Sequence, residues 1–157
     1  MRQTRRDRYW GAKRVAAFSR EELAAVVATA RYRPAAAAYL TDALWRRRER
    51  IVRDAFDETA ALDHFHVDGA EICFTDLWLR AGLGGAGSTA YVVREDGRTI
   101  ATVHSGDERA CAALPARDGY RVLTLAAERP GERRVGQAVA VHLVSHGGAS
   151  RVVGVVH

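Results

Sequence analysis

The spacing of apolar residues changes once along this chain, from a helical period of 3.6 residues to the period of two that is typical of strands. The change falls near residue 60 of 157. It constrains the fold more than any single motif does, because helices and strands bury their apolar faces in different ways. It predicts an α+β protein in which a helical segment, 1–60, packs on an antiparallel β-domain, 61–157.

The helical segment is expected to hold two helices joined by a short connection. Ser19 and Glu22 have the spacing of a capping box, which predicts a helix that ends near Ala30. Pro34 is typical of the first turn of a helix and predicts a second one that runs to about Phe56. This second helix carries one apolar stripe, which we expect to pack inward: Leu40, Leu44, Ile51 and Ala55, widened by Trp45, Val52 and Phe56.

The β-domain shows about seven short strands separated by turn signals. The strongest signal is Asp96-Gly97 between two runs rich in β-branched residues, since a two-residue hairpin turn needs positive φ at both positions. The strands are expected to form an antiparallel β-sandwich or a partly open barrel. They lie at 65–67, 71–74, 91–94, 99–103, 120–127, 135–144 and 151–156.

The net charge of +5 belongs to the first segment alone. Residues 1–57 hold 14 basic and 7 acidic residues, a net charge of +7, whereas residues 58–157 hold 10 and 12, a net charge of −2. Arginine supplies 23 of the 24 basic residues and asparagine is absent, which is typical of a GC-rich coding sequence. The charge therefore favours packing of the two segments on each other over binding of an external polyanion.

An arginine cluster, Arg46, Arg50 and Arg53, lies on the face of the second helix away from the apolar stripe. Three interpretations stay open: a solvated face paired with acidic residues four positions away, a contact with the β-domain or a protein partner, or a phosphate-binding stripe. No aromatic residue is interleaved with these arginines to stack bases, so we expect a protein partner or an upstream domain before nucleic acid. The acidic residues at the pairing positions are Asp42, Glu49 and Asp54.

Arg48 differs from these arginines because it falls inside the apolar stripe, between Leu44 and Val52. A guanidinium in such a place needs a partner. We expect a structural salt bridge from Arg48 to an acidic residue of the second segment, Asp63 or Asp76.

His64 and His66 are the candidates for a metal site, since residues two apart on a strand share a face. Zinc needs three or four protein ligands, and two histidines supply half of such a set. A surface position at the rim of the sheet is the alternative, and we expect neither a metal nor another cofactor. If the two histidines did hold zinc, the protein would be a small metal-dependent hydrolase.

No other motif indicates catalysis. The G-x-G-x-x-G match at 82–87 precedes a strand-like segment, whereas a dinucleotide site needs a helix there, so we expect a flexible loop. Ser105 and Ser145 each neighbour a histidine, but adjacent strand residues point to opposite faces. Asp76 suits a helix cap better than a catalytic role.

The two cysteines, Cys73 and Cys111, form no CxxC pair. We expect two free, half-buried thiols, with a single disulfide as the alternative.

The N-terminal region has some features of a targeting signal. It is basic, and Ala28-Thr29-Ala30 resembles a signal-peptide cleavage site, but the charged residues at 20–22 fit a helix start better. No run approaches the ~20 apolar residues of a membrane span. The sequence therefore predicts no signal peptide, no membrane span and a cytoplasmic location.

Short motifs follow one another along most of the chain: Tyr9-Trp10-Gly11-Ala12-Lys13, Phe18-Ser19 with Glu22, Arg31-Tyr32 before Pro34, Tyr39-Leu40, Arg46-Arg47-Arg48 with Ile51, Leu62-Asp63-His64-Phe65, Phe74-Thr75-Asp76-Leu77 and Ala81-Gly82-Leu83. Together they resemble the C-terminal region of a large, uncharacterised family of bacterial proteins whose preceding region is similar to a protein kinase. Arg33 departs from the family pattern, which has a small or acidic residue there. The chain has no H-R-D or D-F-G motif, so the resemblance implies a non-catalytic accessory or interaction module.

Overall fold

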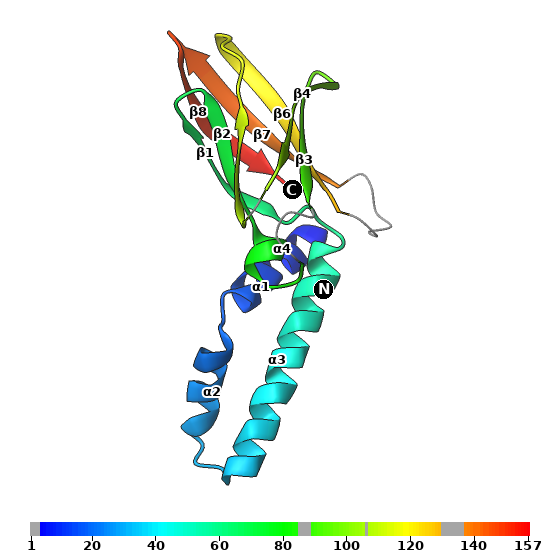
Figure 1. Ribbon diagram of the computed structural model, residues 1–157, viewed down its shortest axis with the longest axis vertical. Coiled ribbons are helices and arrows are strands. Elements are labelled where there is room, and N and C mark those ends of the chain that lie inside the picture. The colour runs from blue at the N-terminus through cyan, green and yellow to red at the C-terminus, as the bar shows by residue number, and fades with distance from the viewer. Residues whose placement is uncertain (1–3, 85–88, 106, 130–136) are drawn as a thin grey trace. The chain divides into compact units, whose positions relative to one another are not determined.

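The chain separates into two compact units, Met1–Glu58 and Thr59–His157. The computed structural model describes residues 4–84, 89–105, 107–129 and 137–157. Figure 1 shows helices in the first unit and, apart from the short α4 (Leu77–Arg80), strands in the second. The predicted α+β class is confirmed, and the division lies two residues before the expected one.

The described part of the helical unit contains three helices, α1 (Arg5–Ala16), α2 (Arg20–Ala28) and α3 (Pro34–Phe56), one more than the predicted pair. The additional helix is α1, and it begins with a capping box. The hydroxyl of Thr4 accepts a hydrogen bond from the backbone N of Asp7 at 3.2 Å. The carboxylate of Asp7 accepts one from the backbone N of Thr4 at 2.9 Å. Both α1 and α2 pack on α3, and α2 runs beside its first half in Figure 1.

The predicted limits of α3 are confirmed, and α2 ends two residues before the expected position. In α2 the Ser19 hydroxyl accepts from the backbone N of Glu22 at 3.1 Å, and the Glu22 carboxylate accepts from the backbone N of Ser19 at 2.7 Å. The helix α3 begins at Pro34 although Arg33, at its N-cap, makes no side-chain capping bond. None of the described helices combines the length and the hydropathy needed to cross a membrane.

The inward face of α3 differs from the predicted stripe. Leu44 and Ile51 are each 39% exposed, whereas Val52 is fully buried. The apolar arc of α3 is wider than the face that α1 and α2 cover, so one edge of the arc stays in solvent. The covered face is rotated by roughly 70° from the predicted one, and its buried residues are Thr41, Arg48, Val52, Ala55 and Phe56.

The described part of the second unit contains eight strands in two antiparallel sheets, one strand more than predicted. The arrangement is a sandwich and not a closed barrel. One sheet has the order β1 (Leu62–Asp68), β2 (Glu71–Asp76), β5 (Arg109–Ala113), and the other β4 (Arg98–His104), β3 (Ala90–Glu95), β6 (Gly119–Glu128), β7 (Ala138–His146), β8 (Ala149–Val156). The expected start of β7 at Val135 lies outside the described residues.

The core of this unit lies between the two sheets. Alternate residues of β2, β3, β5, β6 and β7 point into it, as the period of two predicts. The hairpin turn between β3 and β4 is confirmed, with φ of 49° at Asp96 and 76° at Gly97. Fully buried side chains of the core come from both sheets: Leu62, Ile72, Tyr91, Val93, Ala112, Leu123, Leu125, Val139, Val141 and Leu143.

Cys73 and Cys111 form a disulfide that joins β2 to β5, so the prediction of two free thiols is wrong. The two residues are direct partners in the register of these strands, with their Cα atoms 4.0 Å apart. The pairing could not be foreseen because β5 was not among the expected strands, and nothing else placed Cys111 beside Cys73.

Candidate functional site

The arginine cluster lies on the solvent side of α3, where Arg46, Arg50 and Arg53 are all exposed. The pairing expected within the helix does not hold for Asp42, whose carboxylate binds Arg20 of α2. Among the ion pairs of the described residues, none involves Arg46 or Arg50. The exposed guanidinium groups at these two positions are therefore not neutralised by any side chain that the structure describes in this unit.

Tyr39 belongs to the same face as the arginine cluster. It is 74% exposed, and it precedes Arg46 by seven residues, close to two turns of helix. The expectation that no aromatic residue accompanies the arginines is therefore wrong. The spacing of seven residues between Tyr39 and Arg46 is the sequence signal for this shared face.

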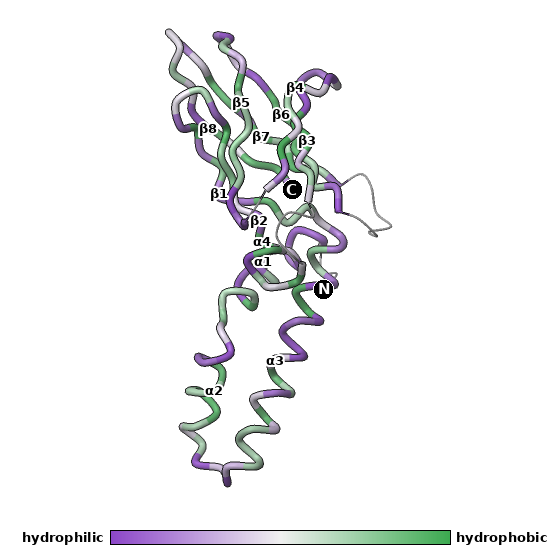
Figure 2. The backbone as a smooth tube through the Cα atoms, in the orientation of Figure 1, coloured by the Kyte–Doolittle hydropathy of each residue, from purple (hydrophilic) through white to green (hydrophobic). Residues whose placement is uncertain are grey.

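An apolar edge lies next to these charges on α3. It consists of Leu44 and Ile51, and Arg47 follows Leu44 on the neighbouring, exposed part of the helix. Figure 2 shows hydrophobic and hydrophilic residues in alternation along α3. We call this region the exposed side of α3, and it comprises Tyr39, Leu44, Arg46, Arg47, Arg50 and Ile51.

Further large apolar side chains of the helical unit are exposed outside α3. Trp10 is 54% exposed, and the guanidinium of Arg14 lies 4.7 Å from the centroid of its ring. The others are Phe18, Val26 and Tyr32, with 48%, 59% and 53% exposure.

Arg48 is buried, with 6% exposure, as its place in the apolar stripe predicts. Its guanidinium donates to the backbone carbonyls of Ala16 at 2.6 Å and Phe18 at 2.9 Å, at the end of α1. It also lies 4.4 Å from the ring centroid of Trp45. Helix ends leave carbonyls without intrahelical partners, and a guanidinium satisfies them. Burial lowers the pKa of Arg48.

The acidic groups named as partners of Arg48 belong to the β unit. Asp76 caps α4, since its Oδ1 accepts from the backbone N of Trp78 at 2.8 Å. Its Oδ2 accepts from the hydroxyl of Tyr91 at 2.7 Å and from the guanidinium of Arg129 at 2.6 Å. The predicted cap is confirmed, while the salt bridge from Arg48 to Asp63 or Asp76 stays a prediction.

This Asp76 cluster is buried and structural in character. Asp76 and Tyr91 are 1% and 0% exposed, and the side chain of Arg129 is 11% exposed. Burial, with the charge of Asp76 next, raises the pKa of Tyr91 well above its ordinary value. The cluster holds one charged pair and a neutral phenol, which keeps the start of α4 tied to β3.

His64 and His66 do not follow the regular alternation of strand faces on which the metal hypothesis depends. The register of β1 is irregular between Asp63 and His66, and His64 has a φ of 55°. The Nδ1 atom of His66 lies 3.1 Å from the backbone carbonyl of His64. The Nδ1 atom of His64 lies 3.4 Å from a guanidinium nitrogen of Arg80. In the described part of the chain, neither histidine belongs to a cluster of three metal-ligating side chains.

The glycine-rich segment and the two serines show no catalytic arrangement among the described residues. Residues 85–87 lie outside them, and the element that follows is β3, where a dinucleotide fingerprint needs a helix. The hydroxyl of Ser105 donates to the backbone carbonyl of Arg109 at 3.0 Å. That of Ser145 shares a hydrogen bond of 2.7 Å with the hydroxyl of Ser150.

An open depression of about 450 Å³ lies at the β3–β4 hairpin. Three of its four charged side chains pair with one another: Arg117 lies 3.0 Å from Glu95 and 3.5 Å from Asp96. These groups satisfy one another, so the depression offers no converging set of polar atoms to a small ligand.

No family model, curated protein or solved structure matches the chain. The resemblance to the tail region of a bacterial family stays a prediction. The exposed side of α3 is thus the feature from which a function can be argued.

Proposed function

We propose that this protein is a non-catalytic interaction module and that the exposed side of α3 binds an acidic partner protein. The observation that carries the proposal is the apolar edge of Leu44 and Ile51, each 39% exposed, beside arginines that no described ion pair neutralises. The buried centre of a protein interface is apolar, and aromatic residues and arginine contribute most of the binding energy there.

The partner that fits this surface is an acidic amphipathic helix. Such a helix would lay its apolar face on Leu44 and Ile51 and place carboxylates opposite Arg46, Arg47 and Arg50. The net charge of +7 over residues 1–57 attracts an acidic partner and disfavours a second copy of the same segment. A kinase-like region upstream, which the resemblance implies, would have to offer the same chemistry to occupy the surface.

A displayed library of helical peptides tests the proposal. We expect selection on the full chain to enrich peptides with apolar residues at helical spacing and flanking Asp or Glu. The variant Leu44→Ser/Ile51→Ser should weaken binding of the selected peptides by about 10-fold or more. The matched control is Val153→Ser/Val156→Ser, which removes two exposed apolar side chains of β8.

Two outcomes would contradict the proposal. One is enrichment of peptides without acidic residues. The other is equal binding to the wild-type chain and to Leu44→Ser/Ile51→Ser, because the apolar edge would then contribute nothing.

Nucleic-acid binding is the second candidate, and Tyr39 is the observation that favours it. An exposed aromatic ring on the same face as Arg46 and Arg50 could stack a base while the arginines contact phosphates. Fluorescence anisotropy with a labelled single strand and a labelled duplex would show binding that weakens steeply between low and physiological salt. Binding that is absent at low salt, or that is unchanged in Arg46→Ala/Arg50→Ala/Arg53→Ala, excludes this candidate.

A further inference from the structure

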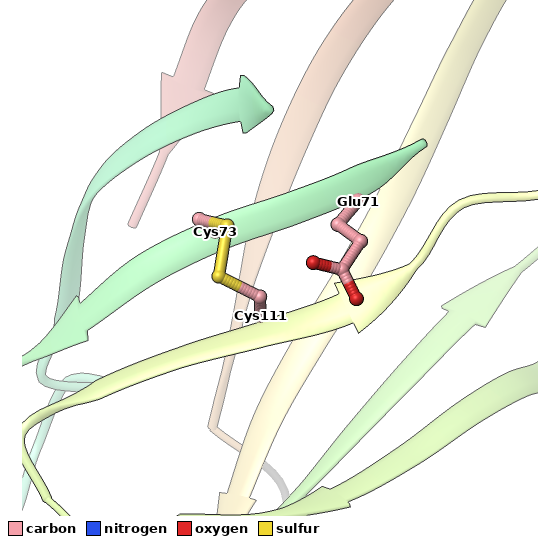
Figure 3. Close-up of side chains that lie close together, drawn as sticks. All are labelled: Glu71, Cys73 and Cys111. Carbon is pink, nitrogen blue, oxygen red and sulfur yellow. A yellow bond between two sulfur atoms is a disulfide. The ribbon is translucent and has the colours of Figure 1, made fainter. Parts of the chain in front are cut away.

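Three metal-ligating side chains lie together on the outer face of the three-stranded sheet. Glu71 and Cys73 are two residues apart on β2 and therefore share a face, and Cys111 is the partner of Cys73 on β5. Figure 3 shows the Glu71 carboxylate beside the disulfide. Their neighbours Ile72 and Ala112 point the other way, into the core.

The ligand atoms of these three side chains, the two Sγ atoms and a carboxylate oxygen of Glu71, lie within 4.8 Å of one another. Glu71 and Cys111 are exposed and Cys73 is buried, so an ion in solution reaches the cluster from the side of Glu71 and Cys111. The sulfur atoms are joined in a disulfide, and a disulfide sulfur is not a thiolate ligand. Metal binding at this place thus requires that the bond be reduced first.

We propose that reduction of the Cys73–Cys111 disulfide creates a zinc site on this face, with both Sγ atoms and the Glu71 carboxylate as its protein ligands. Two molecules of a thiol reductant transfer two electrons and two protons, so that the protein becomes a dithiol and the reductant becomes a disulfide. Zn²⁺ then binds both sulfurs as thiolates and releases their two protons. A water molecule completes the tetrahedron.

Zinc is the ion that this ligand set fits. Thiolates favour it over magnesium and calcium, and Zn–S bonds of about 2.3 Å place two sulfurs roughly 3.8 Å apart in a tetrahedral site. Opposed residues of an antiparallel pair have Cβ atoms about 4.5–5.5 Å apart, which allows that separation. His66 is opposite Cys73 on β1, but its Nδ1 contacts the carbonyl of His64, and it is not part of the site.

Zinc titration of the full chain, followed with a chromogenic competitor and by native mass spectrometry, tests the proposal. The probe is Zn²⁺ alone, and the protein is prepared as disulfide or reduced with a phosphine. We expect one zinc ion per chain in the reduced form and none in the disulfide form. Cobalt added in place of zinc should give a thiolate-to-metal absorption band in the reduced form only.

Variants distinguish the proposed ligands from adventitious binding. Glu71→Gln, which changes an exposed side chain, should weaken zinc binding by at least about 10-fold and keep the cobalt–thiolate band. Glu21→Gln is the matched control, since it changes an exposed glutamate of α2 far along the chain, and it should bind as the wild type does. Cys111→Ser should abolish binding.

Several results would overturn the proposal. These are zinc binding that is equal in the two redox forms, less than one zinc per reduced chain, or an affinity that Glu71→Gln leaves unchanged. Circular dichroism accompanies each preparation. Loss of the β-sheet signal on reduction would also overturn it, because an unfolded chain cannot hold the three ligands together.

Discussion

A buried ion pair at the end of β3 shows what a single charged residue contributes to this sandwich. Arg121 is 3% exposed, and its guanidinium makes two bonds of 2.8 Å to the carboxylate of Glu95. A third bond of 2.8 Å goes to the backbone carbonyl of Pro115. The hydrogen bonds from Arg121 lower the pKa of Glu95, and the same bonds raise the pKa of Arg121. Bidentate pairs of this kind are among the stronger polar interactions in proteins.

Glu95→Gln should therefore destabilise the fold by about 3 kcal/mol near pH 7, because it leaves the Arg121 charge buried without its counter-ion. In the wild type, the stabilisation by the Glu95–Arg121 pair is fully present above the pKa of a glutamate in the unfolded chain, about 4.3. This stabilisation is lost as the pH falls through the lower pKa that Glu95 has in the folded protein. Urea unfolding at pH 7 and pH 3 should show that the difference between wild type and variant narrows in acid. A difference that is the same at both pH values would contradict the assignment, and Glu21→Gln serves as the exposed control.

The disulfide is a second feature of residue scale whose contribution can be measured. Without added metal, reduction should lower the free energy of unfolding by about 2–4 kcal/mol, since the bond closes a loop with a sequence separation of 38. Thermal unfolding with and without a phosphine measures this. Cys73→Ala/Cys111→Ala should unfold at the same temperature under both conditions. A reductant effect that persists in this double variant would show that it does not act through the disulfide.

At the scale of elements, α3 presents two apolar faces with different roles. Val52→Ala should cost about 1–3 kcal/mol because Val52 is fully buried. Leu44→Ser and Ile51→Ser should each change the free energy of unfolding by less than about 1 kcal/mol. Chemical denaturation of the three variants checks the ranking. If Leu44→Ser proved as costly as Val52→Ala, the apolar edge would be part of the core and not a binding surface.

The elements that the sequence did not predict, α1 and β5, both lack a clear pattern of apolar residues or a strong propensity of their own. The helix α1 has a capping box at Thr4 and Asp7, but its apolar residues lack clear helical spacing, so periodicity does not reveal it. The strand β5, Arg-Ala-Cys-Ala-Ala, consists largely of alanine, which has low strand propensity. Its pairing with β2 overrides that propensity. Strands rich in β-branched residues, the hairpin at Asp96 and the capped α2 were predicted because local chemistry and tertiary packing agree there.

The exposed side of α3 was predictable only in part, because the sequence does not show how neighbouring helices cover it. Periodicity places Arg46 and Arg50 on the outer face of α3, and both are exposed. It cannot say how much of a wide apolar arc the neighbouring helices cover, so Leu44 and Ile51 were assigned to the core. The Asp42–Arg20 pair joins two helices, and no spacing along one helix indicates it.

At the scale of the whole molecule, the two units differ in how much apolar surface they bury. The described residues of Met1–Glu58 include six buried apolar side chains, and those of Thr59–His157 include 21. We expect residues 59–157 alone to fold cooperatively, with the circular dichroism of a β-sandwich. We expect residues 1–58 alone to show weak helicity and a broad thermal transition, since so small a core does not offset the chain entropy. A sharp transition for 1–58 would contradict this.

The link between Cys73 and Cys111 also determines how the chain carries mechanical load. A force applied between the two termini passes from β2 to β5 through the sulfurs and bypasses the segment between them. That segment includes α4, β3 and β4, so two strands of the five-stranded sheet are shielded while the bond is intact. With a separation of 38 residues, the shielded length is roughly 130 Å at full extension. A single molecule pulled from its ends should lengthen by that much more after reduction, which makes its extension a direct record of its redox state.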